Sequence, residues 1–330
     1  MEYMQREKIS YRKAIYRALD RVLGSDEKVV FMGEDISEYG GAFGVSADLY
    51  RRYPSRVIST PISEGSVAGA AVGLSMTGYR VIVEIMFMDF ITLAMDQIIN
   101  HAANIHYMYG GQVSCPIVIR APAGGYRGYG PSHSKTLEGL FLGIPGLKIV
   151  APSTVQDAWG ALISAIYDNN PVLFIEHKLL YNMEGEIDLD YKIGPIGRAR
   201  IAREGADVTV VSHSYGTHLS MRAAQELSAQ GIEAEVIDLV SLKPLDIGAV
   251  AASVEKTGRL VTVEEGDLSG GVGAEVVSRV VEDCLPYIDG RIVRVGKPDV
   301  PIPASIMAES RVLPGVDDIV DAAKRTLSWE

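Results

Sequence analysis

Apolar residues recur along the chain at two spacings, which predict strands and helices in regular succession. Residues 11–23 place their apolar side chains on one helix face, and Ser10 precedes them as a cap. Continuous apolar runs that predict strands follow at residues 28–33, 80–87, 116–121, 147–152 and 171–177. Helical patterns lie between them at residues 64–76, 89–108 and 154–168. Apolar strands separated by helices indicate a parallel sheet covered on both faces.

The same alternation resumes after a polar, acidic stretch. Residues 186–199 contain Pro195 and two glycines, and they predict a linker. Strands are then expected at residues 206–214, 233–240, 258–265 and 291–296, with a helix after each. We therefore expect an α/β protein of two domains, each a mostly parallel sheet covered by helices. The predicted domains are residues 1–185 and 200–330.

Composition narrows the possible partners. A chain of 330 residues agrees with two domains, and its net charge of −11 argues against nucleic acid or an anionic membrane as main partner. No apolar run reaches the length of a membrane span, and the first residues lack the apolar core of a signal peptide. The expected location is the cytoplasm, or a mitochondrial or plastid matrix if a presequence has been removed.

The stretch TPISEGSVAGAAVGLS, residues 60–75, is almost wholly small or apolar after Glu64. Gly65, Gly69 and Gly73 are four residues apart and share one helix face, which predicts a tight helix–helix or subunit contact. Glu64 has two interpretations. It is either an acid in the first helical turn, where its negative charge interacts favourably with the helix dipole, or a buried carboxylate held for proton chemistry.

Further segments widen this pattern to nearly the whole chain. They are GEDISEYGGAFGVS (33–46), EIMFMDF (84–90), DQIINHAA (96–103), HSK (133–135), PGLKIVAPST (145–154), DNNPVLFIEHKLLY (168–181), SLKPLD (241–246), VEEGDLSGGVGAEV (263–276) and DVPIPAS (299–305). Together they resemble the β subunits of thiamine diphosphate-dependent 2-oxo acid dehydrogenases, which include pyruvate, branched-chain and acetoin dehydrogenases. The resemblance implies a pyrimidine-binding domain and a transketolase C-terminal-like domain. It also implies oxidative decarboxylation of a small, pyruvate-like 2-oxo acid, or acetoin cleavage, with reductive acylation of a lipoyl group.

The resemblance also implies roles for three residues. Glu64 stands where the family's glutamate hydrogen-bonds a pyrimidine nitrogen of thiamine diphosphate, which favours the imino tautomer that takes the thiazolium proton. Phe90 matches the aromatic residue that packs on the pyrimidine ring, although its local pattern is that of a core residue. His133 matches a histidine that transfers protons or binds the intermediate in reductive acylation, and its ordinary pKa of about 6.5 suits that work. Its local alternative is a surface-loop histidine.

The glycine-rich loop that carries His133, residues 121–139, is expected to become ordered when cofactor or partner arrives. Lys135 stands where family members often have glutamine. This lysine either favours an anionic neighbour or is a solvated loop residue.

Some relatives hold potassium with backbone carbonyls and one or two side chains. The matching positions are Ile117, Ala165, Ile166, Asp168 and Asn170. The simpler interpretation is a structural turn capped by Asp168.

The Gly-Asp-Gly segment with which thiamine enzymes bind diphosphate and magnesium is missing, since Leu268 follows Gly266 and Asp267. The diphosphate and magnesium half of the site must then come from another chain. The resemblance implies an α subunit, an α2β2 tetramer and a lipoyl acyltransferase core. Glu282, Asp283 and Asp289 are candidates, on charge alone, for contact with a basic binding domain of that core.

Two other classes stay open. A transketolase-like half that acts on sugars needs several histidines and arginines aimed at a sugar phosphate, and the sequence lacks such a cluster. A non-catalytic assembly or nucleotide-binding protein fits the turn DLSGGVGAEV, residues 267–276, if this turn is an anion cradle. The alternative is that its glycines allow a tight crossover.

Overall fold

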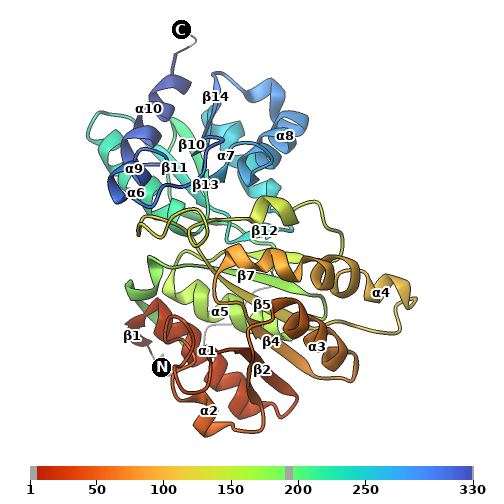
Figure 1. Cartoon of the computed structure of the whole chain (residues 1–330). Coiled ribbons are helices and arrows are strands. Elements are labelled where there is room, and N and C mark those ends of the chain that lie inside the picture. Colours follow the sequence, from red (N-terminus) through yellow and green to blue (C-terminus); the bar gives the residue numbers. More distant parts are fainter. Residues whose placement is uncertain (1–5, 190–195, 329–330) are drawn as a thin grey trace, which may run out of the picture. The chain divides into compact units, whose positions relative to one another are not determined.

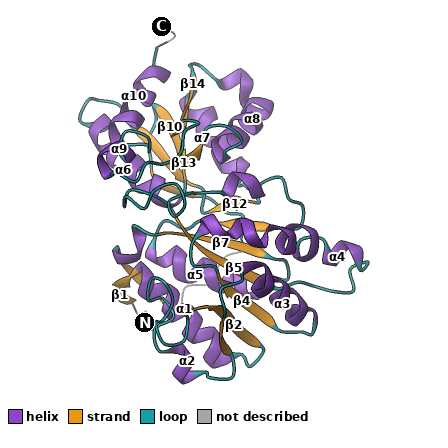
Figure 2. Cartoon of the chain, viewed as in Figure 1, coloured by secondary structure: helices purple, strands orange, loops and turns teal. Residues whose placement is uncertain are grey.

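The computed structural model describes residues 6–189 and 196–328. The chain divides into two compact units (Figure 1). The first comprises the described residues up to Ala123 and those from Gly143 to Ile196, and the second comprises Gly124–Leu142 and the chain from Gly197 onward. In each unit, helices flank a layer of strands (Figure 2). This is the expected α/β architecture with mostly parallel sheets.

The sheet of the first unit joins parallel strands through apolar, buried residues. Their spatial order is β6 (Lys148–Val150), β7 (Val172–His177), β5 (Ile117–Ala123), β4 (Arg80–Glu84), β2 (Val29–Glu34) and β3 (Val57–Thr60). The helices of this unit include α1 (Tyr11–Ser25), α2 (Leu49–Arg52), α3 (Glu64–Met76), α5 (Val155–Tyr167) and the short η4 (Leu180–Asn182). Parallel strands bring their carboxyl ends to one edge, which is where ligands bind in such sheets.

A small antiparallel pair in the first unit was not predicted. Strand β1 (Arg6–Ser10) pairs with β8 (Glu184–Asp188). The pair is too polar to show an apolar pattern, and ion pairs such as Lys8–Glu184 at 3.0 Å link it. Strand β8 takes the first residues of the predicted linker 186–199, and residues 190–195 of that linker lie outside the described residues.

The single long helix predicted at residues 89–108 is wrong. The structure has a 3₁₀ segment η1 (Met88–Ala94), a π segment η2 (Gln97–Ala102) and a short helix α4 (Ile105–Met108). Side chains take up backbone carbonyls here: the Thr92 hydroxyl donates to the Asp89 carbonyl at 3.0 Å. The Asn104 amide donates to the Ile99 carbonyl at 3.1 Å. Such local bonds compete with the regular helix ladder.

The second unit has its own sheet, in the order β14 (Ile292–Lys297), β13 (Leu260–Asp267), β10 (Val208–Ser212), β11 (Ala234–Asp238) and β9 (Arg200–Arg203). Only β9 among these described strands runs antiparallel to its neighbour. The longer helices are α6 (Ser214–Ser228), α7 (Ile247–Thr257), α8 (Val272–Cys284) and α10 (Val316–Thr326). The shorter elements are η3 (Glu138–Phe141), β12 (Ser241–Lys243), η5 (Leu285–Tyr287) and α9 (Ile306–Glu309). Valines of the strands and apolar residues of α6 and α10 form its core.

The glycine face of α3 packs inside the chain. A Cβ atom on Gly65 would lie 3.0 Å from the carbonyl oxygen of Leu93, and one on Gly69 would lie 3.3 Å from the side-chain oxygen of Gln97. Gly73 faces open space. The predicted tight contact is therefore made by α3 with η1 and η2 at its first two glycines, and only Gly73 remains available for a partner subunit.

Candidate active site

Glu64 is the first residue of α3, and its side chain is 5% exposed. It lies near a second buried carboxylate, Glu34, which ends β2 and is 1% exposed. The backbone N–H of Ser63 donates to Glu34 at 3.1 Å and ties the start of α3 to the end of β2. Within the described residues, the Glu64 carboxylate has no hydrogen-bond partner, so it is available to a ligand.

The two carboxylates influence each other. Burial raises the pKa of Glu34, and the negative charge of Glu64 raises it further, against the opposing hydrogen bond from Ser63. The second oxygen of Glu34 has no partner among the described groups. A buried carboxyl group with a raised pKa holds its proton more readily near neutral pH. Glu34 lies in the segment GEDISEYGGAFGVS (33–46), but the sequence assigns it no role. Its place beside Glu64 is visible only in the structure.

Phe90 belongs to a row of aromatic rings on the first unit. Its ring centroid lies 6.2 Å from that of Phe87, and Phe87 lies 5.3 Å from Phe43, both edge-to-face. Phe90 sits in η1, and α3 packs against η1 through Gly65. The structure therefore brings Glu64 and Phe90 onto neighbouring elements of the same unit.

His133 belongs to the second unit and is half-buried. The Ser132 hydroxyl lies 2.9 Å from its Nδ1 atom. Lys135 is exposed two residues further on. The loop has defined contacts in the chain alone: Gly125 and Gly128 donate backbone hydrogen bonds to Glu265 and Glu309. These contacts lie within the chain, and further ordering on binding of cofactor or partner stays a prediction.

A buried ion network lies among the central strands of the first unit. Arg120 in β5 donates to Glu84 in β4 at 2.5 Å and to both oxygens of Glu176 in β7 at 2.6 and 2.8 Å. Tyr181 donates to Glu176 at 2.9 Å. These side chains are at most 3% exposed. The strand register places Glu84 opposite Arg120, so the network links the carboxyl ends of three neighbouring strands, β4, β5 and β7.

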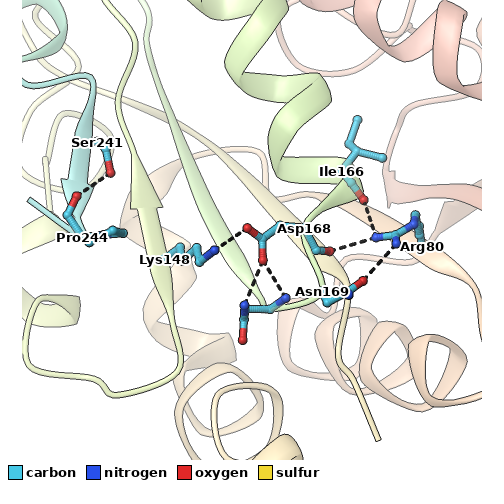
Figure 3. Close-up of polar contacts among 8 residues, drawn as sticks. Arg80, Lys148, Ile166, Asp168, Asn169, Ser241 and Pro244 are labelled. Carbon is cyan, nitrogen blue, oxygen red and sulfur yellow. Dashed lines mark hydrogen bonds and ion pairs between the residues drawn. The ribbon is translucent and has the colours of Figure 1, made fainter. Parts of the chain in front are cut away.

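The candidate potassium residues gather at the start of β5, the end of α5 and the turn after it. Arg80 donates to the backbone carbonyls of Ile166 and Asp168 at 3.0 and 2.9 Å (Figure 3). The Asp168 carboxylate accepts from Lys148 and from the backbone and side chain of Asn170. Burial raises the pKa of Asp168, but these hydrogen bonds lower it by more. Asp168 thus caps the turn, as the simpler interpretation expects.

The glycine-rich turn of the second unit is filled by the chain itself. The two carboxylate oxygens of Glu264 accept from the N–H groups of Val272 and Gly273, at 2.8 and 2.9 Å, where α8 begins. A Cβ atom on Gly273 would lie 2.8 Å from Glu264, which explains the glycine. The anion-cradle interpretation is therefore wrong, because a carboxylate already occupies this helix terminus. Burial raises the pKa of Glu264 to about 7.

The residues that the structure describes contain neither a cluster of metal-ligating side chains nor a membrane-spanning helix. Among these residues, no group of three or more His, Cys, Asp or Glu side chains is placed so that it could hold a metal ion. No helix there has the length and apolar character to cross a membrane.

Known proteins resemble this chain from end to end. The transketolase pyrimidine-binding domain matches residues 7–184, and the transketolase C-terminal domain matches residues 197–319. Pyruvate dehydrogenase E1 component subunit beta from Rhizobium meliloti is 44% identical over 318 residues, which are 96% of this chain and 69% of that protein. The chain belongs to this E1 β-subunit family.

Other members of the E1 β-subunit family cover the chain equally well. The Rickettsia bellii protein is 42% identical over 96% of this chain and 98% of its own length. The Oryza sativa protein named subunit beta-2, mitochondrial, is 44% identical over 97% of this chain and 86% of its own length. Among solved structures, a split-gene transketolase described as an inactive β4 tetramer has a TM-score of 0.80 at 27% identity, over 97% of this chain and 98% of its own.

Proposed function

We propose that this chain is the β subunit of the decarboxylating component of a 2-oxo acid dehydrogenase complex, with a small, pyruvate-like substrate. One observation carries the proposal: Glu64 is buried at the start of α3 without a protein partner, in a chain that is 44% identical to an E1 β subunit. Thiamine diphosphate, when bound, supplies the carbon acid and electron sink for decarboxylation. Residues 1–185 and 200–330 are the domains of this proposal.

In this proposal, the Glu64 carboxyl group shares its proton in a hydrogen bond with a pyrimidine nitrogen of thiamine diphosphate. The surroundings support the assignment, since Ser63 binds Glu34 and leaves Glu64 free to reach a ligand. The Glu64 side chain is 5% exposed, so little solvent competes with a ligand for it. Phe90 offers a half-buried aromatic face for a ring. His133 moves a proton during reductive acylation of a lipoyl group, or binds the reacting group there.

A partner α subunit completes the site by supplying the diphosphate and magnesium half, in an α2β2 tetramer. The missing Gly-Asp-Gly segment supports this need for a second chain. The exposed Glu282, Asp283 and Asp289 contact a basic domain of the lipoyl acyltransferase core, although Asp289 also pairs with Arg259 at 3.8 Å. We propose the cytoplasm as the location. A mitochondrial or plastid matrix is the alternative, and the Oryza sativa relative is named as mitochondrial.

Potassium binds, in this proposal, at Ile117, Ala165, Ile166, Asp168 and Asn170. The carbonyls of Ile166 and Asp168 already accept from Arg80, but a carbonyl oxygen has two lone pairs and can also face an ion. The test compares melting temperatures in potassium chloride and lithium chloride at equal ionic strength. Asp168→Asn should remove the potassium effect. Equal melting temperatures in both salts would reject the site.

The central test is Glu64→Gln in the complex with the α subunit. The variant should fold and assemble, yet decarboxylation should fall by about 100-fold or more, because glutamine cannot share an acid proton. Glu226→Gln, on the exposed face of α6, is the matched control and should keep full activity. A Glu64→Gln complex with normal turnover would overturn the proposal.

A transketolase-like half that acts on sugars is the alternative, and similarity to the split-gene transketolase supports it. The complex should be assayed with pyruvate, acetoin, branched-chain 2-oxo acids and sugar phosphates. Turnover of sugar phosphates alone would favour the alternative. A non-catalytic role predicts indifference to both thiamine diphosphate and Glu64→Gln.

A further inference from the structure

The loop that carries His133 packs as part of the second unit, although it directly follows β5 of the first unit. Residues Gly124–Leu142 belong to the same compact unit as the chain from Gly197 onward. Its base is closed by the N–H of Gly124, which donates to the carbonyl of Lys135 at 3.3 Å. The His133 N–H donates to the Gly130 carbonyl at 3.4 Å. His133 therefore lies on a closed loop whose position depends on contacts with the second unit.

Two buried carboxylates receive backbone amides of this loop. The N–H of Gly125 donates to Glu265, on β13, at 2.6 Å. The N–H of Gly128 donates to Glu309, at the end of α9, at 2.8 Å. Glu309 is 0% exposed and Glu265 is 9% exposed. A hydrogen bond is electrostatically stronger in a buried environment than in water, so these two bonds anchor the loop.

Tyr126 lies between the two anchored glycines and shows that the segment is held in one conformation. Its φ angle is +60°, which few residues other than glycine adopt without support. The Tyr126 hydroxyl donates to the Pro314 carbonyl at 2.9 Å, and its ring lies 5.4 Å from that of Tyr215. Partners from several elements of the second unit thus fix the loop on both sides of this residue.

The anchors leave no room for side chains at the bonded glycines. A Cβ atom on Gly125 would come within 2.6 Å of Leu313 and 2.8 Å of Glu309. A Cβ atom on Gly128 would come within 2.9 Å of the Ala304 carbonyl. The backbone can approach the carboxylates only because these positions are glycine.

We propose that Glu265 and Glu309 are positioning residues for His133: they hold the loop that carries it and so fix where its imidazole works. The inference rests on the proposed function for the role of His133, while the anchoring itself can be measured without turnover. Neither carboxylate touches the reacting groups in this proposal. Each acts through the loop backbone.

The test measures amide hydrogen exchange in the complex with the α subunit, for Glu309→Ala, Glu309→Gln and Glu265→Ala. Exchange over residues 124–135 should rise about tenfold or more in the alanine variants and stay near normal over α6. Glu309→Gln keeps an oxygen acceptor and should restore most protection. Unchanged exchange in both alanine variants would overturn the anchoring, whatever the chain catalyses. If Glu309→Ala does not fold, Glu265→Ala at the more exposed anchor decides.

Kinetics separate positioning from general stability. Reductive acylation should slow in Glu309→Ala through kcat, with KM for the 2-oxo acid little changed. In a His133→Ala background, the same substitution should produce no further loss, because its effect passes through His133. An equal loss in both backgrounds would overturn the positioning role. Failure of the proposed function would instead show as full activity in Glu64→Gln, with the exchange result still readable.

Discussion

The imidazole Nε2 of His213 lies 3.1 Å from a carboxylate oxygen of Glu138, and both side chains are buried in the second unit. Burial lowers the pKa of His213, but the hydrogen bond and charge of Glu138 raise it by more, so the net shift is upward. The charges of Glu264 and Asp238 add to the increase. The second unit therefore buries a hydrogen-bonded His213–Glu138 pair near Glu264, a carboxyl group whose pKa is raised to about 7.

This arrangement predicts that stability falls as the pH rises. A group whose folded-state pKa is raised stabilises the fold below its unfolded pKa and loses that contribution as the pH passes the folded value. For Glu264 the window runs from the ordinary 4.5 to about 7, which corresponds to about 3 kcal/mol. For His213 the loss begins near the ordinary 6.5 and continues upward. Urea unfolding from pH 4.5 to 8 measures the slope.

Glu264→Gln is the control for this slope. Glutamine does not titrate, so the free energy of unfolding of the variant should vary less between pH 4.5 and 7 than that of the wild type. Parallel curves for the two proteins would show that Glu264 is not the titrating group.

Arg120 compensates two buried carboxylates, so its removal should be severe. Arg120→Met should lower the free energy of unfolding by about 3–5 kcal/mol, because the buried Glu84 and Glu176 would lose their cationic partner. Replacing both glutamates by glutamine in the same variant should recover part of the loss. Denaturant titration measures both effects, and an Arg120→Met chain of normal stability would contradict the network.

Two glycines on one face of α3 should respond in opposite directions to alanine. Gly73→Ala should stabilise the chain by about 0.5–1 kcal/mol, because the position is helical and open. Gly65→Ala should destabilise it by about 1–3 kcal/mol, because the new methyl group meets the Leu93 carbonyl. Thermal unfolding compares them. If Gly73→Ala also weakens α-subunit binding, the open end of this face is a subunit contact.

Glu34 should stabilise the fold mainly as the hydrogen-bond acceptor of the Ser63 N–H. Glu34→Ala removes the acceptor of the Ser63 N–H and should cost about 0.5–1.5 kcal/mol of stability, the net value of a typical hydrogen bond. Glu34→Gln retains an oxygen for Ser63 and should be close to wild type in stability. Similar losses in both variants, measured in urea, would show that the charge of Glu34 and not its hydrogen bond supports this region.

The sequence predicts an element well where one periodicity persists. Helix α3 begins and ends at the expected residues 64 and 76, because small apolar residues continue without a break. The long helix over residues 89–108 fails because Thr92 and Asn104 bond to carbonyls, and apolar spacing does not register such bonds. Strands β1 and β8 pair through their backbones and carry mostly polar, charged side chains, so neither strand shows an apolar signal.

The sequence likewise predicts only part of the candidate site. The pattern after Glu64 places that residue at a helix start, and the structure agrees. Its neighbour Glu34 is 30 residues earlier in the sequence and becomes a neighbour only through the pairing of β2 with β3 and the Ser63 hydrogen bond. The Glu264 cap was missed because a glycine-rich turn before a helix has the same pattern whether an anion or a carboxylate of the chain fills it.

The origin of the His133 loop limits how this chain can be divided. A cut in residues 190–195 separates the two matched regions, but it places His133 in one fragment and both Glu265 and Glu309 in the other. A fragment carrying the first region would then expose the amides of Gly125 and Gly128 that the second region binds. For chimaeras between family members, the natural unit of exchange is therefore the loop together with its two carboxylates. Exchange at residues 190–195 would separate the loop from these two carboxylates.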